Sequence, residues 1–458
     1  MVMTNGLDPV SESLMRWIQQ QADERRTDYE LTRRYYGGDH DTALTDRLKK
    51  FLPPRLQFRD NFMNVVVDSL SERLTVLGFD IEDETISAWT GELWARNRMD
   101  YMQTVVHTET IMIGDSYVLC DWDEMNERPR WTHQMGEMIV PHYNENTRVI
   151  DWASKKWVQR PRIGEEPETR LNLYYPDRVE KYVARGGVWT RFSEPEELWP
   201  VSWVDRSGEP IGVPLIHFRN RPMGGDFGQS EIINVIPMQD LLNKTLIDLT
   251  MILDTLAFPQ RYTLNVNHGA SRLDILPGSV TEFHSEFDGG TVGQWSAATV
   301  DGPLKSIETL VQHIAGTTRT PQHLFQIMGG VPSGEALKTA ESGLVNKAKQ
   351  RMVNFGNSWE DALMMAMRVQ AAFGTALPDI EEGAIKTTWD DPETRNEQAH
   401  MESLKSKVEL GITKHQIWRE MGYTQEQIDQ MDEDGTQERA SETNIGAEIL
   451  RNFQAGTI

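Results

Sequence analysis

Residues 320–334, TPQHLFQIMGGVPSG, form a stretch without aspartate, glutamate, lysine or arginine between two long helical patterns. Before this stretch, Pro303 stands at the favoured first position of a helix that we expect to end near Gly316. After it, apolar residues at helical spacing predict a very long helix from near Ser333 to Phe373. Because proline and glycine interrupt the stretch, and because it is shorter than the roughly 18 residues that a membrane helix needs, it predicts a connecting loop.

Another long helical pattern, from Ser230 to Leu256, precedes this arrangement, and Pro237 is expected to kink its first half. Between this helix and the one that begins at Pro303, residues 258–302 are rich in glycine and in β-forming residues, which predicts strands and turns. A compact enzyme seldom extends two helices to carry a small β insertion. The order of helix, β insertion, helix, loop and longer helix is instead typical of an elongated subunit that packs side by side in a ring.

The N-terminal half combines helices with a separate β region, which predicts an α+β fold. Apolar residues at helical spacing predict helices over 10–35, 61–74, 86–97 and 100–113. From 115 to 220, aromatic residues and valine alternate with charges, which is typical of a meandering β region with a hairpin across Gly186-Gly187. Cys120 lies in a strand-like run and is expected to be buried. Short helices are expected after Pro392 and at the capping boxes Thr413–Gln416 and Thr424–Gln427.

The 458 residues include 46 lysines and arginines against 70 aspartates and glutamates, which gives a net charge of −24. This balance argues against an autonomous nucleic-acid binder, because affinity for phosphates comes mainly from lysine and arginine. An acidic surface is still compatible with a protein past which DNA slides. The single cysteine excludes an internal disulfide and a multi-thiolate metal site. The first residues contain no apolar segment of the signal-peptide type, so we expect a product that is assembled inside the cell.

The sequence contains no phosphate-loop, dinucleotide-binding, nucleophile-elbow or zinc-protease motif. Its histidines do not pair at metal-binding spacing, so we expect no catalytic, cofactor-binding or metal-ligating residue. Asp121 and Asp123 could be cast as a glycosidase pair, but alternating charges at a strand end more often form a solvated edge. Residues 411–428 superficially resemble a DNA-reading helix-turn-helix. The 17 acidic and 8 basic residues of 381–458 oppose that function.

Several short motifs occur in a fixed order along the chain: Tyr35–Gly38, Asn61–Phe79, Gly114–Val118, Gly228–Glu231, Pro237–Lys244, Phe258–Arg261, Thr320–Leu324, Ser333–Leu337 and Trp389–Pro392. None of them is specific alone, but their order and spacing extend over nearly the whole sequence. In this respect the chain resembles the portal proteins of tailed double-stranded DNA phages, of the siphophage type common in actinobacterial phages.

The resemblance implies an α+β portal-protein fold with an elongated subunit and a homo-dodecameric ring at one vertex of the capsid. The implied parts are an α/β wing in 1–228, a stem helix in 229–256, a small β-containing clip in 257–302, a second stem helix in 303–319, a tunnel loop in 320–334, a long wing helix in 335–380 and a C-terminal wing or crown in 381–458.

The resemblance also implies a protein that is not an enzyme and needs no cofactor. The ring would seed the procapsid with the major capsid and scaffolding proteins, dock the terminase large subunit during packaging, and later dock head-completion adaptors. Double-stranded DNA would pass non-specifically through the channel. The expected location is the virion, with assembly in the host cytoplasm and no membrane contact. The candidate docking residues in the clip are Arg261, Arg272, Glu282 and His284.

Two further sets of candidate residues flank the start of the long third helix. An uncharged loop with flexible glycines can contact moving DNA without holding its phosphates, although an ordinary helix connector is the alternative. The candidates in this loop are Gln322, His323, Gln326, Met328, Gly329 and Gly330. Lys338, Lys347, Lys349 and Arg351 form the densest basic stretch, which is expected to meet acidic neighbours across a subunit interface or to face the channel.

Two other functions stay open on the sequence alone. One is another structural head component, such as an adaptor or minor capsid protein, against which the size and the element order argue. The other is a phage-encoded carboxylate-dependent hydrolase, against which the missing phosphate, nucleophile and metal motifs argue.

Overall fold

The computed structural model describes residues 9–41, 59–159, 167–185, 188–193, 197–257, 261–264, 291–294, 299–325, 334–381 and 383–393, together with 407, 411, 413, 416–418, 428, 430 and 431. The chain divides into two compact units, Met1–Pro392 and Glu393–Ile458, and the helices and strands below belong to the first. Helices and antiparallel sheets are mixed in it, which agrees with the expected α+β class.

Helices dominate the N-terminal part at close to the expected ranges: α1 (Pro9–Tyr36), α3 (Phe62–Ser71), α4 (Glu84–Arg96) and α5 (Met99–Ile113). Side-chain caps fix two of the starts. The Asn61 side chain accepts a hydrogen bond from the Met63 N–H, and the Asp83 side chain accepts one from the Ile86 N–H.

Two antiparallel sheets occupy the region expected to be a β meander. One has the strand order β10-β2-β3, and the other has the order β4-β5-β6-β7-β8 with β9 paired to β7. Cys120 in β2 is fully buried, as expected, and burial raises the pKa of its thiol. The bounds are β2 (Asp115–Asp123), β3 (Arg128–Met135), β4 (Ile139–Tyr143), β5 (Ile150–Gln159), β6 (Glu168–Tyr174), β7 (Arg178–Arg185), β8 (Val188–Arg191), β9 (Val201–Ser202) and β10 (Leu215–Arg219).

The long helix α8 (Gly334–Phe373) packs on β10 and β2 and begins within one residue of its expected start. Its Trp359 is fully buried, with the ring 4.7 Å from that of Phe218 and the indole N–H donating to His107 Nε2 at 2.9 Å. A buried aromatic side chain of this size stabilises a core by roughly 3–5 kcal/mol. A small sheet of β1 (Val76–Asp80) and β13 (Lys386–Trp389) lies beside the same helix.

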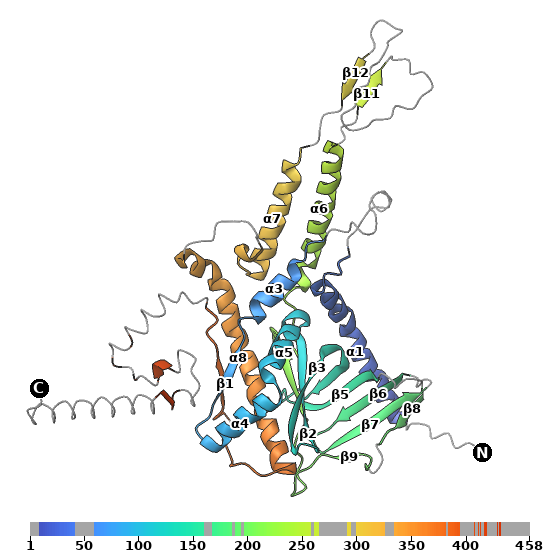
Figure 1. Ribbon diagram of the computed structural model, residues 1–458. Helices are drawn as coiled ribbons and strands as arrows, with labels where there is room; N and C mark the ends of the chain where they lie inside the picture. Colours follow the sequence, from blue (N-terminus) through green and yellow to red (C-terminus); the bar gives the residue numbers. More distant parts are fainter. Residues whose placement is uncertain are drawn as a thin grey trace, which may run out of the picture. The chain divides into compact units, whose positions relative to one another are not determined.

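A helix pair, α6 (Ile236–Ala257) and α7 (Asp301–Thr318), packs side by side (Figure 1). The strands β11 (Arg261–Leu264) and β12 (Thr291–Gln294) form an antiparallel pair between the end of α6 and the start of α7. The expected kink at Pro237 is wrong. The helix starts at Ile236 after the short 3₁₀ turn η2 (Ile233–Val235), so Pro237 lies in the first turn, where its missing N–H leaves no helical bond unmade.

The second unit has few described residues. The Gln416 N–H donates to the Thr413 carbonyl at 3.1 Å, and residues 416–418 are helical, as the first capping box predicted. The second box and the helix expected after Pro392 lie outside the described residues. Among the helices that the structure describes, none is long and apolar enough to cross a membrane.

Candidate functional site at the base of the helix pair

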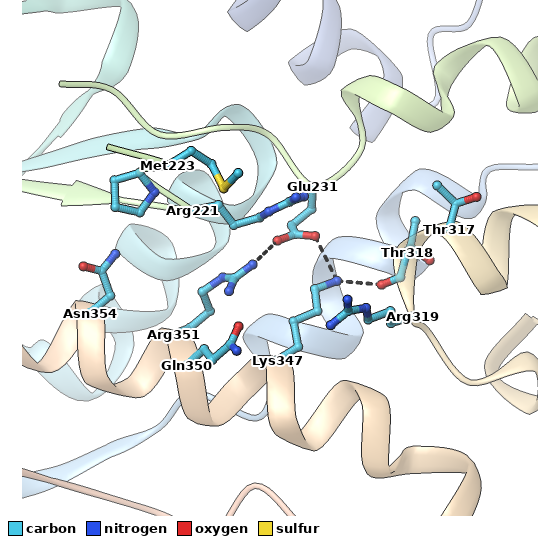
Figure 2. A pocket seen from close by; sticks show the side chains of 11 residues that line it. Arg221, Met223, Glu231, Thr317, Thr318, Arg319, Lys347, Gln350, Arg351 and Asn354 are labelled. Atoms are coloured by element: carbon cyan, nitrogen blue, oxygen red, sulfur yellow. Dashed lines mark hydrogen bonds and ion pairs between the residues drawn. The ribbon is translucent and has the colours of Figure 1, made fainter. Parts of the chain in front are cut away.

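A buried ion-pair group connects three segments where the helix pair joins the rest of the first unit (Figure 2). Glu231, just before η2, accepts from Lys347 Nζ at 2.9 Å and from the Arg351 guanidinium, both on α8. Arg351 also donates to Asn220, which follows β10 and in turn donates to Glu231 at 3.2 Å. We call these four residues the Glu231 cluster.

The charged members of the Glu231 cluster are almost completely removed from water. Their side chains are 3% exposed for Glu231, 6% for Lys347 and 7% for Arg351. Burial alone would raise the pKa of Glu231, but the two cations outweigh it and hold that pKa below its usual value. Burial likewise lowers the pKa of Lys347, against the opposing charge of Glu231. Each charge therefore depends on the others to remain buried.

Lys347 also closes the C-terminal end of α7. Its ammonium group donates to the Thr318 carbonyl oxygen at 2.8 Å, which is one of the carbonyls that a helix end leaves without a partner. A cation at this end also opposes the negative end of the helix dipole. The next residue, Arg319, has a left-handed backbone with φ 54°, and the Thr320 N–H returns to the Ala315 carbonyl at 3.0 Å.

The segment that carries Glu231 is fixed by two closely packed glycines. A Cβ atom on Gly228 would clash with the carbonyl oxygen of Gly114, which itself has φ 108°. The same Gly114 oxygen accepts from the Asn220 N–H at 2.8 Å, and the Gly228 N–H donates to Asp115 Oδ1 at 2.7 Å. Two of the motifs quoted from the sequence, at 114–118 and 228–231, therefore meet in space.

The first turns of α6 are held by the buried side chains of Gln239 and Asn243 and by the half-buried side chain of Asp240. Gln239 accepts from the Phe62 N–H at 3.0 Å and donates to the Asp60 carbonyl at 2.8 Å. Asn243 accepts from the Asp60 N–H at 3.0 Å, and Asp240 accepts from the Tyr35 hydroxyl at 2.7 Å. The base of α6 is thus bonded to the end of α1 and to the residues that open α3.

The beginning of the candidate tunnel loop folds into a short helical turn, which the expectation of a connecting loop did not include. Residues 322–325 form the 3₁₀ turn η3 (Gln322–Phe325), with the buried Phe325 ring 5.3 Å from that of Phe62. His323 Nε2 lies 3.3 Å from Glu341 on α8, whose carboxylate also pairs with Arg73 at 3.0 Å. Leucine, phenylalanine and histidine in a charge-free stretch can serve packing, which explains the difference. Among the loop candidates, Gln326, Met328, Gly329 and Gly330 lie outside the described residues.

A family model described as "Phage portal protein, SPP1 Gp6-like" matches residues 15–440. The chain belongs to this family of phage portal proteins. The portal protein of Mycobacterium phage D29 is 24% identical over 388 residues, which cover 79% of this chain and 76% of the relative. The portal protein of Mycobacterium phage L5 is 24% identical over 402 residues, covering 81% and 77%. The chain is therefore a phage portal protein, which is a structural protein and not an enzyme, and the resemblance seen in the motifs is confirmed.

Among solved structures, a chain of "Neck of empty GTA particle computed with C6 symmetry" matches with a TM-score of 0.46 and 10% identity. The match covers 84% of this portal protein and 95% of that chain.

The basic stretch of the portal protein divides into two kinds of residue. Lys338 and Lys349 are exposed on α8, and their contact with another subunit stays a prediction. Lys347 and Arg351 were expected to meet acidic neighbours across a subunit interface or to face the channel, but both are buried and pair with Glu231 of the same chain. Sequence reasoning missed Glu231 in this role, although it stands in a quoted motif and is the one acid beside the apolar Ile232-Ile233 pair.

The remaining candidates of the portal protein are the four clip residues and the carboxylate pair at the end of β2. Arg261 lies in β11, whereas Arg272, Glu282 and His284 lie outside the described residues. The half-exposed Asp121 carboxylate pairs with Arg130 at 3.4 Å at the end of β2, as a solvated strand edge does. Over the described part of the chain, no group of three or more His, Cys, Asp or Glu residues could hold a metal ion.

Proposed function

We propose that this portal protein forms a dodecameric ring at one vertex of the capsid and that the ring is the channel for DNA packaging and ejection. The observation that carries the proposal is the family match over residues 15–440. The order of α6, the β11–β12 pair, α7 and α8 agrees with the element order of a subunit whose helix pair is a stem.

The proposed division of the chain follows the implied parts of a portal subunit. Residues 1–228 are the wing, 229–256 and 303–319 the stem, 257–302 the clip, 320–334 the tunnel loop, 335–380 the long wing helix and 381–458 the crown. The overlap of α6 and α7 with the stem ranges, which they exceed by only one and two residues at the clip side, supports the division, as does the location of β11 and β12 within the clip range.

In this proposal the clip docks the terminase large subunit during packaging and the head-completion adaptors afterwards. The capsid and scaffolding proteins contact the ring during assembly. DNA passes through without sequence recognition, which the charge balance supports. Twelve copies carry 12 × −24 = −288 charges, and a surface of that sign repels phosphates from a wall rather than binding them.

The contacts at the base of the helix pair are suited to transmitting force from the stem helices to the wing. Gln239, Asp240 and Asn243 join α6 to α1 and to the start of α3, and Lys347 joins the end of α7 to α8. A displacement of the stem is therefore passed to the wing through buried and partly buried hydrogen bonds and not through a loose linker. At the tunnel loop, Phe325 and Glu341 hold the described residues on either side of 326–333.

Electron microscopy of the purified full-length protein tests the proposal directly. Class averages should contain rings with a central hole, and their rotational symmetry should be twelvefold. Mass photometry of the same sample should give one species of the corresponding mass. A monodisperse monomer over a range of protein concentration, salt and pH would refute the ring.

A further inference from the structure

A cavity of about 570 Å³ lies beside the Glu231 cluster, between the segment after β10, the end of α7 and α8 (Figure 2). Its lining carries four cationic side chains, those of Arg221, Arg319, Lys347 and Arg351, and one acid, Glu231. Four positive charges against one negative charge leave 4 − 1 = +3 at the cavity. This local excess occurs in a chain whose net charge is −24.

Two of the three excess charges belong to Arg221 and Arg319, and the third is left by Lys347 and Arg351 against the single carboxylate of Glu231. Lys347 and Arg351 already share Glu231, whereas neither Arg221 nor Arg319 has an acid within ion-pair distance among the residues that the structure describes. The excess positive charge also affects the pKa of Lys347. After burial, which is the larger cause, the charges of Arg351 and Arg221 lower the pKa of Lys347, although Glu231 opposes them. The cavity therefore presents positive charge that the described part of the chain does not neutralise.

The backbone supplies a second and independent observation. Arg221 has φ 51° and Arg319 has φ 54°, so both adopt the left-handed conformation. That conformation costs a residue with a Cβ atom roughly 1–2 kcal/mol, and glycine would adopt it without that cost. Strained non-glycine residues are concentrated at ligand sites. Here two arginines in this conformation line one cavity, from segments about a hundred residues apart.

We propose that this cavity binds a phosphate group. Guanidinium groups present paired N–H donors that match phosphate oxygens, and the Gln350 side chain adds a neutral polar group to the lining. A phosphate dianion neutralises two of the three excess charges, whereas a carboxylate neutralises one. The phosphate comes either from solution or from a DNA backbone. The proposal does not depend on the ring, because the cavity lies within one chain.

A phosphate group bound in the cavity would connect the three segments that border it. Arg221 precedes α6 in the chain, Arg319 directly follows α7, and Lys347 and Arg351 belong to α8. A ligand that binds only the folded arrangement raises the stability of that arrangement with its concentration. Phosphate should therefore stabilise the base of the helix pair.

The test uses the full-length chain and the variant R221Q/R319Q, which removes the two charges that no acid of the described residues pairs with and leaves the Glu231 cluster intact. The matched control is K305Q/K338Q, because Lys305 and Lys338 are exposed on α7 and α8 and lie outside the cavity lining. Thermal unfolding is followed against inorganic phosphate at constant ionic strength, with succinate as the carboxylate reference. In a second arm, fluorescence anisotropy measures binding of a labelled 20-base-pair DNA duplex.

Phosphate should raise the unfolding temperature of the wild type and of the control, and its apparent Kd should be at least tenfold weaker for R221Q/R319Q. A duplex that binds wild type and control but not R221Q/R319Q identifies the DNA backbone as a source. Binding of free phosphate alone identifies phosphate from solution. The proposal is overturned if neither ligand distinguishes R221Q/R319Q from the control. Equal stabilisation by succinate also overturns it, since the cavity would then take a carboxylate, such as one from a neighbouring copy.

Discussion

Glu231→Gln is the substitution that most directly tests the role of the Glu231 cluster. It keeps the size of the side chain and removes its negative charge, so that Lys347 and Arg351 remain buried beside a neutral amide. Lys347 retains the Thr318 carbonyl and Arg351 retains Asn220 as hydrogen-bond acceptors. The substitution therefore removes the negative charge that compensates the two cations but leaves each cation one hydrogen-bond acceptor.

Removing one partner of a buried ion pair typically costs about 3–5 kcal/mol. Two features of this cluster place the expected loss of stability near the lower end of that range. Both cations keep one acceptor each, and Lys347 can lose its proton more easily than an exposed lysine because burial lowers its pKa. We therefore expect Glu231→Gln to reduce the free energy of unfolding by about 3 kcal/mol.

Urea unfolding followed by circular dichroism, at one fixed protein concentration, measures this difference because association with other copies also changes apparent stability. Glu308→Gln is the matched control, since Glu308 is exposed on α7 and should change stability by less than about 0.5 kcal/mol. A loss below about 1 kcal/mol for Glu231→Gln would show that the cluster does not stabilise the base of the helix pair.

The same pair of proteins has a defined pH dependence. The folded pKa of Glu231 lies below its ordinary value of 4.5, so the unfolded chain binds this proton more tightly than the folded chain. The stabilisation by Glu231 is thus complete above that ordinary value and is lost as the pH falls through the lower folded pKa. The difference between wild type and Glu231→Gln should be constant near neutral pH and decrease in acid. A difference that grows in acid would contradict the assignment.

Three other substitutions test different parts of the molecule. His107 is fully buried, and burial lowers its pKa from 6.5 to about 4. Because the unfolded chain then binds the proton more tightly, the free energy of unfolding of the wild type should fall by about 3 kcal/mol between pH 6.5 and 4 through this group. Urea titrations at the two pH values should show a correspondingly smaller fall for His107→Gln. Phe325→Ala should cost about 3–5 kcal/mol by removing the contact with Phe62, and a cost below 1 kcal/mol would mean that η3 is not fixed in the core. Gln326→Arg and Met328→Arg should slow packaging in a DNA-protection assay if the tunnel loop approaches DNA, whereas unchanged packaging in both would contradict that proximity.

Local signals account for the parts of the fold that the sequence predicts well. The start of α8 follows from the glycine and proline before it, and the helical period of its apolar residues continues to Phe373. The start of α6 is different. Residues from Ser230 onward have an apolar helical spacing, but the Ser230 hydroxyl donates to the Met112 carbonyl and the Glu231 N–H donates to the Ile111 carbonyl. These long-range bonds hold the segment outside the helix until the 3₁₀ turn begins at Ile233, and the periodicity of the sequence does not contain them.

The candidate site was predictable only in part for the same reason. The density of lysine and arginine on α8 directed attention to Lys347 and Arg351, but nothing local indicates that their acid lies at Glu231, more than a hundred residues away. Arg221 and Arg319 carried no signal at all. A left-handed backbone is suggested by glycine or asparagine, and an arginine in that conformation is recognised only from the folded chain.

The acidic net charge and the basic cavity act over different distances. At physiological ionic strength the field of exposed charges is screened within about 8 Å, so the −24 of the chain governs how a long polyanion approaches the surface. Lys347, Arg351 and Glu231 are buried and Arg221 is half-buried, so their fields are screened much less than that of the exposed Arg319, and they govern what is held once a single group has entered the cavity. A protein can therefore repel DNA along its surface and still bind one phosphate group. Raising the salt concentration should separate the two effects, because it weakens the surface repulsion more than the binding within the cavity.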